Sequence, residues 1–183
     1  ASDPTSDNIM YAVTDTGSDL NTRMWTGAAW DCSAPLAGAC NASHTEHSAG
    51  VEDILDMNFD IVFETHPANP GIAWLVFGNG ATVSRKRWNG AWAAATTSGD
   101  DTAYVALAAH PFKDSGAVFA AIYEDNTSAT DDITAMQLTA GGAVWPATTQ
   151  LWGGPIVANP VRNRVAVRGE RALVPIYSIE VFP

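Results

Sequence analysis

Apolar residues along the chain come in short runs, and each run ends at a turn residue. The runs are rich in β-branched and aromatic side chains, and Gly, Asn, Asp and Pro bound them. Helical periodicity is almost absent, so the pattern predicts an all-β fold. The expected strands are Ile9–Thr14, Leu20–Trp25, Asn58–Thr65, Ile72–Phe77, Thr82–Trp88, Ala103–Ala109, Ala117–Tyr123, Ile133–Thr139, Arg164–Arg168 and Leu173–Phe182, with a helical turn at Ser48–Leu55.

The order of strands and turns recurs along the chain. Residues 11–30 (YAVTDTGSDLNTRMWTGAAW), 73–92 (AWLVFGNGATVSRKRWNGAW) and 118–145 each contain an apolar strand, a polar turn, an alternating strand and a Gly turn before Trp. An apolar strand ending in His66-Pro or His110-Pro precedes the second and third copies. With a short strand opened by the Gly-x-Trp turn, the unit has about four strands.

A four-stranded meander that recurs in this way resembles a blade of the secreted β-propeller repeat proteins. The resemblance implies one domain over residues 1–183, built from antiparallel, four-stranded, propeller-like repeats. A β-sandwich also consists of many short strands and is the alternative fold. The first copy lacks its leading strand, and the last hairpin, from Arg164 onwards, lacks a closing Gly-x-Trp strand. We therefore expect incomplete repeats at both ends.

Incomplete repeats leave sheet edges that pair with other strands. In the C-terminal segment RALVPIYSIEVFP, Ser178 and Glu180 alternate with apolar residues, as in a strand with one apolar face. This predicts a structural subunit that assembles with copies of itself by strand pairing, into a ring or a filament. An ordinary terminal strand within its own sheet is the alternative. The expected assembly residues are Leu173, Ile176, Ile179, Val181 and Phe182.

Two of the hairpins place Arg close to Trp. Because fucose-type propeller lectins carry a similar hairpin, the resemblance implies a carbohydrate site at Arg23, Trp25, Arg87 and Trp88. The third copy departs from this pattern, since it has Met, Gln and Leu at residues 136–138, and no Glu or Gln stands regularly beside the Arg. The alternative for the closing tryptophans is packing between neighbouring sheets. These residues are Trp30, Trp92 and Trp145.

The chain lacks the common catalytic motifs. It has no Gly-x-Ser-x-Gly elbow, phosphate-binding loop or dinucleotide fingerprint, so we expect a protein that is not an enzyme. A fragment of a longer propeller enzyme is the alternative. The segment HTEH brings His44, Glu46 and His47 together, which suits zinc, but its spacing differs from that of the zincin helix. A solvated loop is the preferred interpretation of this segment.

The net charge of the chain limits the classes of binding partner that we expect. The chain has 20 acidic and 9 basic residues, a net charge of −11. Nucleic acid is therefore not an expected partner, because phosphate contacts need clustered Lys and Arg. Acidic turns suit Ca²⁺, although Asp also stabilises turns by bonding its own backbone. The candidate calcium ligands are Glu124, Asp125, Asp131 and Asp132.

Three features indicate an extracellular or cell-surface protein. Cys32 and Cys40 close a short loop and are expected to form a disulfide, with free thiols as the alternative. Asn41 and Asn126 begin glycosylation sequons in expected loops. The first residue, Ala1, suits a processed N-terminus. No apolar run reaches the length of a membrane span.

Overall fold

The computed structural model describes most of the N-terminal two thirds of the chain and parts of the rest. The described residues are 1–14, 19–30, 45–48, 58–68, 70–78, 82–98, 104–110, 117–124, 132–138, 149–153, 164–168 and 176–180. Every regular element among them is a β-strand, and all strand pairs are antiparallel. This confirms the prediction of an all-β, antiparallel fold.

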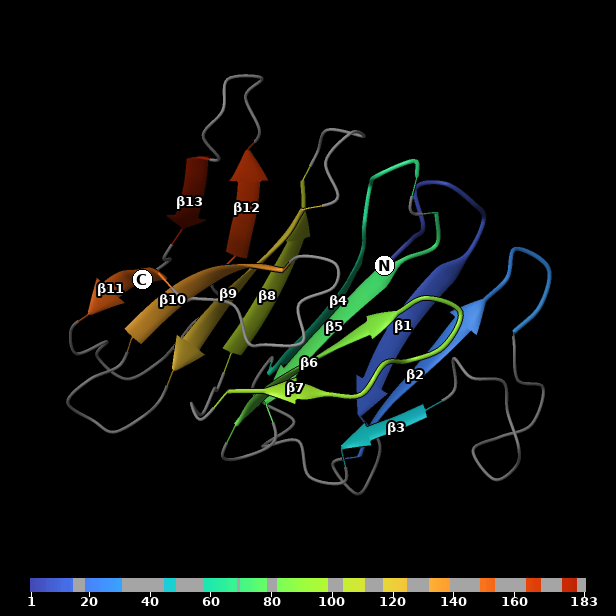
Figure 1. The fold of residues 1–183 in the computed structure, drawn as a ribbon, viewed down its shortest axis with the longest axis horizontal. Coiled ribbons are helices and arrows are strands. Elements are labelled where there is room, and N and C mark those ends of the chain that lie inside the picture. The colour runs from blue at the N-terminus through green and yellow to red at the C-terminus, as the bar shows by residue number, and fades with distance from the viewer. Residues whose placement is uncertain are drawn as a thin grey trace.

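The strands form four sheets, and each sheet is a meander of consecutive strands (Figure 1). Sheet A consists of β1 (Ile9–Thr14), β2 (Leu20–Trp25) and β3 (Thr45–Ser48). Sheet B consists of β4 (Phe59–Phe63), β5 (Ala73–Gly78), β6 (Val83–Trp88) and β7 (Thr96–Thr97). Sheet C consists of β8 (Tyr104–Ala109), β9 (Val118–Glu124), β10 (Asp132–Leu138) and β11 (Thr149–Gly153). Sheet D consists of β12 (Arg164–Arg168) and β13 (Ile176–Glu180).

The strands with an apolar pattern lie close to where the sequence places them. β1, β2 and β12 have the predicted bounds, and the others differ by a few residues. The helical turn expected from Ser48 is wrong at that residue, because Ser48 is the last residue of β3 and pairs with Leu20. β3, β7 and β11 had no predicted bounds. Each is the last strand of its meander, where pairing of the backbone rather than an apolar side-chain pattern defines the strand.

The first strands of successive sheets lie beside one another. β1 contacts β4, β4 contacts β8, and β8 contacts β12. Two hydrogen bonds join sheets B and C at this place. The Asp60 carboxylate accepts a bond of 2.7 Å from the backbone N–H of Leu107, and the Thr65 hydroxyl donates one of 2.7 Å to the carbonyl of His110. Sheet B therefore lies between sheets A and C (Figure 1).

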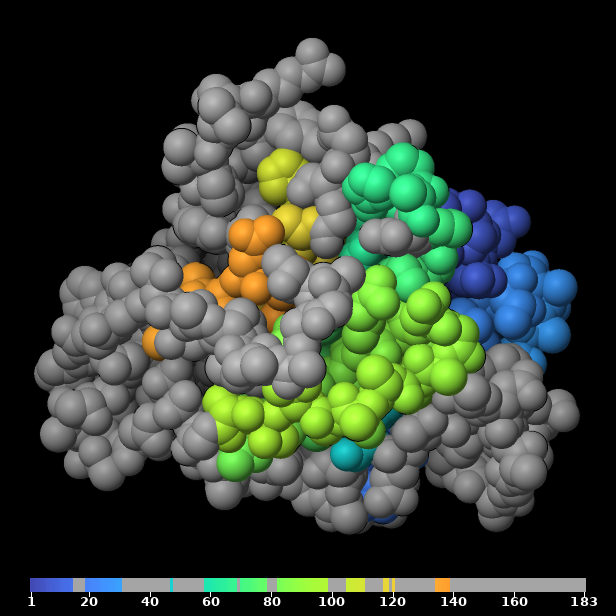
Figure 2. Space-filling model, viewed as in Figure 1, coloured from blue at the N-terminus to red at the C-terminus, as the bar shows by residue number. Residues whose placement is uncertain are grey.

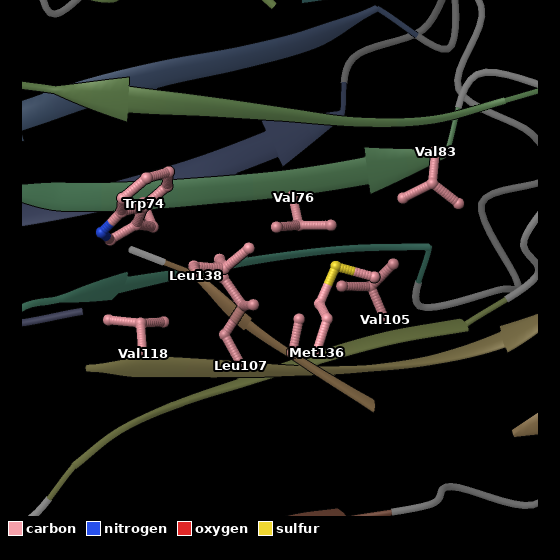
Figure 3. Packing of buried hydrophobic residues seen from close by; sticks show 9 residues of the cluster. Trp74, Val76, Val83, Val105, Leu107, Val118, Met136 and Leu138 are labelled. Carbon is pink, nitrogen blue, oxygen red and sulfur yellow. The ribbon is translucent and has the colours of Figure 1, made fainter. Parts of the chain in front are cut away.

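Sheets B and C pack face to face through an apolar core (Figure 3). Trp74, Val76 and Val83 point from sheet B towards side chains of sheet C, and Figure 3 shows them facing one another. Burying this much apolar surface is the main stabilising contribution to the contact between the sheets. The sheet C members of this core are Val105, Leu107, Val118, Ala120, Met136 and Leu138.

The opposite face of sheet B packs on sheet A. Because successive strand residues point to opposite faces, Ala73, Leu75 and Phe77 lie on the side of β5 away from Trp74 and Val76. All six residues of β5 are buried, so this strand has apolar neighbours on both faces. Met10 and Leu20 of sheet A, both fully buried, lie in the two clusters that cover this second face. The contacts between sheets A and B and between sheets B and C thus each bury one face of both partners.

Candidate functional site

The two predicted Arg-Trp hairpins end in the same local structure. β2 ends at Trp25 and β6 at Trp88, and in each case the chain turns back so that a second tryptophan, Trp30 or Trp92, forms an isolated bridge with the first. The turns contain Gly27 and Gly90 at φ values of 84° and 76°. Glycine adopts this left-handed region without the steric cost that other residues incur. The two turns therefore share one local structure.

The two tryptophans of each turn contact each other edge to face. The ring centroids of Trp25 and Trp30 are 5.3 Å apart at 69°, and those of Trp88 and Trp92 are 5.5 Å apart at 60°. Tyr11 adds a third ring to the first pair, 5.2 Å from Trp30. These geometries are the favoured ones for aromatic pairs, and each is worth about 1 kcal/mol beyond the area buried.

The two turns differ in what covers them. Trp88 is 6% exposed and packs with Met10, Phe63 and Ala73 in the core between sheets A and B. Trp92 also packs there, 4.7 Å from the ring of His47 on β3. Trp30, the counterpart of Trp92, is 45% exposed. Packing between neighbouring sheets thus describes Trp92, whereas the ring contacts of Trp30 among the described residues are with Tyr11 and Trp25 of its own sheet.

The structure does not bring Arg87 and Trp88 to one site. As neighbours on β6 they point to opposite faces of sheet B. The Arg87 Nε atom lies 3.5 Å from the Glu64 carboxylate, and its guanidinium carbon lies 5.8 Å from the centre of the Trp74 ring. Since the ring of Trp88 is in the core, a sugar has little of its face to stack on. A ligand at this hairpin stays a prediction, without support from the placement of its two residues.

Glu64 is the centre of a buried polar cluster in sheet B. It is 1% exposed and accepts a hydrogen bond of 2.8 Å from Trp74 Nε1. Arg85 is 2% exposed, and its guanidinium carbon is 5.5 Å from the Trp74 ring centre. Burial lowers the pKa of Arg85. Glu64, Trp74 and Arg85 are therefore buried together beside the partly exposed Arg87, and two cation–π contacts and an ion pair offset their loss of water.

Arg23 and Trp25, by contrast, lie on the same face of sheet A. They are two residues apart on β2, and both are half-buried. Tyr11 is paired with Arg23 in the ladder, and Ile9 with Trp25. This face thus holds the partly open aromatic cluster of Tyr11, Trp25 and Trp30 beside one cation. Of the two predicted ligand positions, only this one combines Arg and Trp on one surface.

His47 lies between sheets A and B rather than in a solvated loop. The interpretation of the HTEH segment as a loop is wrong for residues 45–48, which form β3 and pair with β2. The His47 ring is 2.8 Å from the Thr22 hydroxyl through Nε2 and packs against Trp92 and Phe77. Burial, with a smaller contribution from the positive charge of Lys86, lowers the pKa of His47 to about 3. The ring is therefore neutral at physiological pH.

The other predicted site residues lie partly or wholly outside the described part of the chain. Glu124 and Asp132 are paired across the β9–β10 hairpin, while Asp125 and Asp131 fall outside. Within the described ranges, no three His, Cys, Asp or Glu side chains gather as a metal site. Ile176 and Ile179 belong to β13, where they pair with Arg168 and Val165. The predicted residues outside the described ranges are Cys32, Cys40, Asn41, Asn126, Leu173, Val181 and Phe182.

One surface was not singled out from the sequence. Ile9, Val13 and Trp30 are the exposed large apolar residues of the described chain, at 45%, 42% and 45%, and all three belong to sheet A or the turn after it. The alternation of Ile9, Tyr11 and Val13 along β1 was the available signal, because it puts three large apolar side chains on one face. The sequence did not show that two of these side chains, Ile9 and Val13, stay exposed in the folded chain.

The described segments contain no helix that is long and apolar enough to cross a membrane. Comparison of the chain with protein-family models, curated proteins and solved structures gives no match. The function is therefore inferred from the arrangement of the four sheets and from the surfaces that they bury or leave open.

Proposed function

We propose that this chain is an extracellular, non-enzymatic structural subunit. In this proposal, propeller-like sheets continue from one copy to the next through β-strand pairing at sheet D. The observation that carries it is the size of sheet D, which has two strands in the described chain, whereas sheets B and C have four each. A two-stranded sheet is marginal in water unless further strands or packing complete it.

Several features support the propeller-like order of the sheets. Each described sheet is a meander, and the first strands of sheets A, B, C and D lie in sequence beside one another. Strand β5 of sheet B is buried on both faces against the neighbouring sheets, as in a blade within a row of blades. Such a row is extended by adding one more sheet of the same kind, which a second copy of the chain carries.

β13 is the strand through which we propose that copies pair. It is joined to β12 from Ile176↔Arg168 to Glu180↔Arg164, and within the described residues no strand lies on its other side. A free edge presents a row of backbone N–H and C=O groups that another strand can bond. In the sequence, Ser178 and Glu180 alternate with Tyr177 and Ile179, which is the pattern typical of a strand with one apolar face.

The test is a measurement of assembly with and without the terminal strand. We expect the full chain to form oligomers or filaments in light scattering and electron microscopy, and deletion of residues 173–183 to yield monomers. The control replaces these residues by a Gly/Ser segment of equal length. A peptide of residues 171–183 added in trans is expected to shorten the assemblies, and the same peptide with Ile179→Pro to leave them unchanged. A full chain that is monomeric, or assemblies that survive the deletion, contradict strand pairing.

A carbohydrate-binding module is the second candidate. The observation that favours it is the position of Arg23 and Trp25 on one partly open face with Tyr11 and Trp30. Aromatic rings beside a polar group are a usual arrangement for stacking a sugar. Glycan-array binding that is lost in Trp25→Ala and retained in Gln137→Ala, an exposed position on sheet C, would support this candidate. Binding that survives Trp25→Ala would exclude this face.

A further inference from the structure

The outer face of sheet A is an apolar surface that the described chain does not cover. We define it as the side of β1 and β2 that carries Ile9, Tyr11, Val13, Arg23 and Trp25, together with Trp30. Asn21, which pairs with Val13 on the same side, is buried. Sheet A, in blue, lies at one rim of the molecule next to sheet B (Figure 2). Three of these side chains are more than 40% exposed. Exposed apolar side chains gathered on one sheet face indicate an interaction site.

The repeat shows what such a face normally does. β1 and β2 correspond to β5 and β6, because Ile9 pairs with Trp25 as Ala73 pairs with Trp88. Ile9, Tyr11 and Val13 therefore match the residues of β5 that face sheet A. Those residues are Ala73, Leu75 and Phe77, which are exposed by 0%, 0% and 2%. The same face is thus interior in sheet B, whereas in sheet A Ile9 and Val13 are exposed and Tyr11 is half-buried.

The surface that covers this face in sheet B is the inner face of sheet A. Met10 and Leu20, with Ala12 and Met24 beside them, come from the inner face of sheet A and cover sheet B. His47 of the same face meets Trp92. The occupant of an outer face in this molecule is therefore the inner face of another sheet. For the outer face of sheet A, no described sheet of the same chain takes that role, since sheet D contacts β8 of sheet C.

We propose that the outer face of sheet A is an interface for a second copy of this chain, which supplies a sheet that packs on it as sheet A packs on sheet B. The inference rests on the proposed self-assembly and adds to it a face-to-face contact distinct from strand pairing. The contact is heterologous, because the inner face of sheet A is already buried on sheet B. Such contacts run head to tail and close into a ring or continue as a filament.

The charge on the strands of this face is compatible with contact between two copies. The chain carries a net charge of −11, so two copies repel each other on average. The β1 and β2 positions of the outer face carry no carboxylate, and Arg23 contributes a positive charge. Two copies that meet at these strands therefore bring no strand carboxylate of this face into the contact.

The experiment compares charge substitutions on and off the outer face. Val13→Asp and Ile9→Asp place a carboxylate within the proposed contact, while Ala94→Asp adds the same charge at an exposed position in the connection between β6 and β7. By sedimentation velocity of the full chain, we expect the first two to weaken self-association by at least about tenfold and the third to match the wild type. We expect thermal unfolding to show that all three variants are folded and have midpoints close to that of the wild type, because Ile9 and Val13 are exposed.

A mixing experiment tests the head-to-tail geometry. A Val13→Asp chain has one impaired end and one intact end, so it should cap growing assemblies and shorten them when added to wild type in equal amount. If the Val13→Asp chain associates as strongly as the wild type does, the proposed interface is wrong. A wild-type chain that stays monomeric up to about 100 µM also contradicts it. The two contacts are separable. Loss of assembly only on deleting residues 173–183 supports strand pairing alone, and loss only in Val13→Asp supports the outer face alone.

Discussion

At the scale of single residues, His47 combines a pH-sensitive group with a buried position. Its ring packs against Trp92 and Phe77, and its Nδ1 atom is buried with no hydrogen-bond partner among the described residues. The pKa is lowered to about 3 from 6.5, so between these values the unfolded chain binds a proton that the folded chain does not. The free energy of unfolding therefore falls as pH falls through this window.

We expect the titration of His47 to lower the free energy of unfolding of the wild type by about 2 kcal/mol when the pH falls from 7 to 5. His47→Gln removes the titration and retains a group that can bond Thr22, so its stability should change less over the same range. Urea unfolding of both proteins at the two pH values measures the difference. Parallel pH dependence in the two proteins would show that the ring is solvated.

The two turn glycines separate backbone strain from crowding. Both have a positive φ, but a Cβ at Gly27 would lie 2.7 Å from Asp7 Cβ, whereas a Cβ at Gly90 would meet nothing within 4 Å. Gly90→Ala should cost about 1 kcal/mol through φ alone. Gly27→Ala should cost at least about 1 kcal/mol more, because the backbone around Asp7 must shift. Chemical denaturation of both variants measures the order, and equal losses would contradict the contact with Asp7.

At the scale of elements, β4 and β8 are held together by a side chain that reaches from one sheet to the next. Asp60 accepts hydrogen bonds of 2.7 Å from the backbone N–H groups of Ile61 and Leu107. Burial raises the pKa of Asp60, and the two bonds act against that rise. We expect Asp60→Ala to lower the free energy of unfolding by about 1–3 kcal/mol, since the N–H of Leu107 loses its acceptor.

Asp60→Asn is the matched variant for this contact. Its amide oxygen still accepts one of the two bonds, and no charge is buried, so we expect a smaller loss than in Asp60→Ala. Urea unfolding at neutral pH measures both variants. If the two are equally destabilised, the charge rather than the bond to Leu107 joins the strands. If neither is destabilised, the contact between β4 and β8 does not depend on this side chain.

The strands also show which parts of the fold can be predicted from the sequence alone. Alternation and turn residues were enough for β1 and β2, because side-chain pattern decides which residues leave water. The pattern was not enough for β3 or β7, since short polar strands at the end of a meander depend on a partner that is distant in the chain. Alternation also implies that Arg87 and Trp88 point apart. The burial of Trp88, however, depends on sheet A covering sheet B, which is a property of packing.

At the scale of the whole molecule, two tryptophans at equivalent positions have different surroundings. We therefore expect them to have different roles. Trp92 packs between sheets A and B, and Trp30 lies on the outer face of sheet A. In Trp92→Ala we expect a loss of about 2 kcal/mol or more in stability, because a cavity opens between sheets, and little change in self-association of the folded protein. In Trp30→Ala we expect a loss of about 1 kcal/mol or less, with clear weakening of self-association.

Urea unfolding and sedimentation velocity on the same two variants measure this contrast, and each variant is the control for the other. The comparison is direct, because both substitutions remove the same atoms from equivalent turns of two sheets. If Trp30→Ala destabilises the monomer as much as Trp92→Ala, a sheet of the same chain covers Trp30 in solution. A single chain then closes its own row of sheets, and the open outer face is not an interface between copies. If association alone responds to Trp30→Ala, the contact that sheet A makes with sheet B is repeated between molecules.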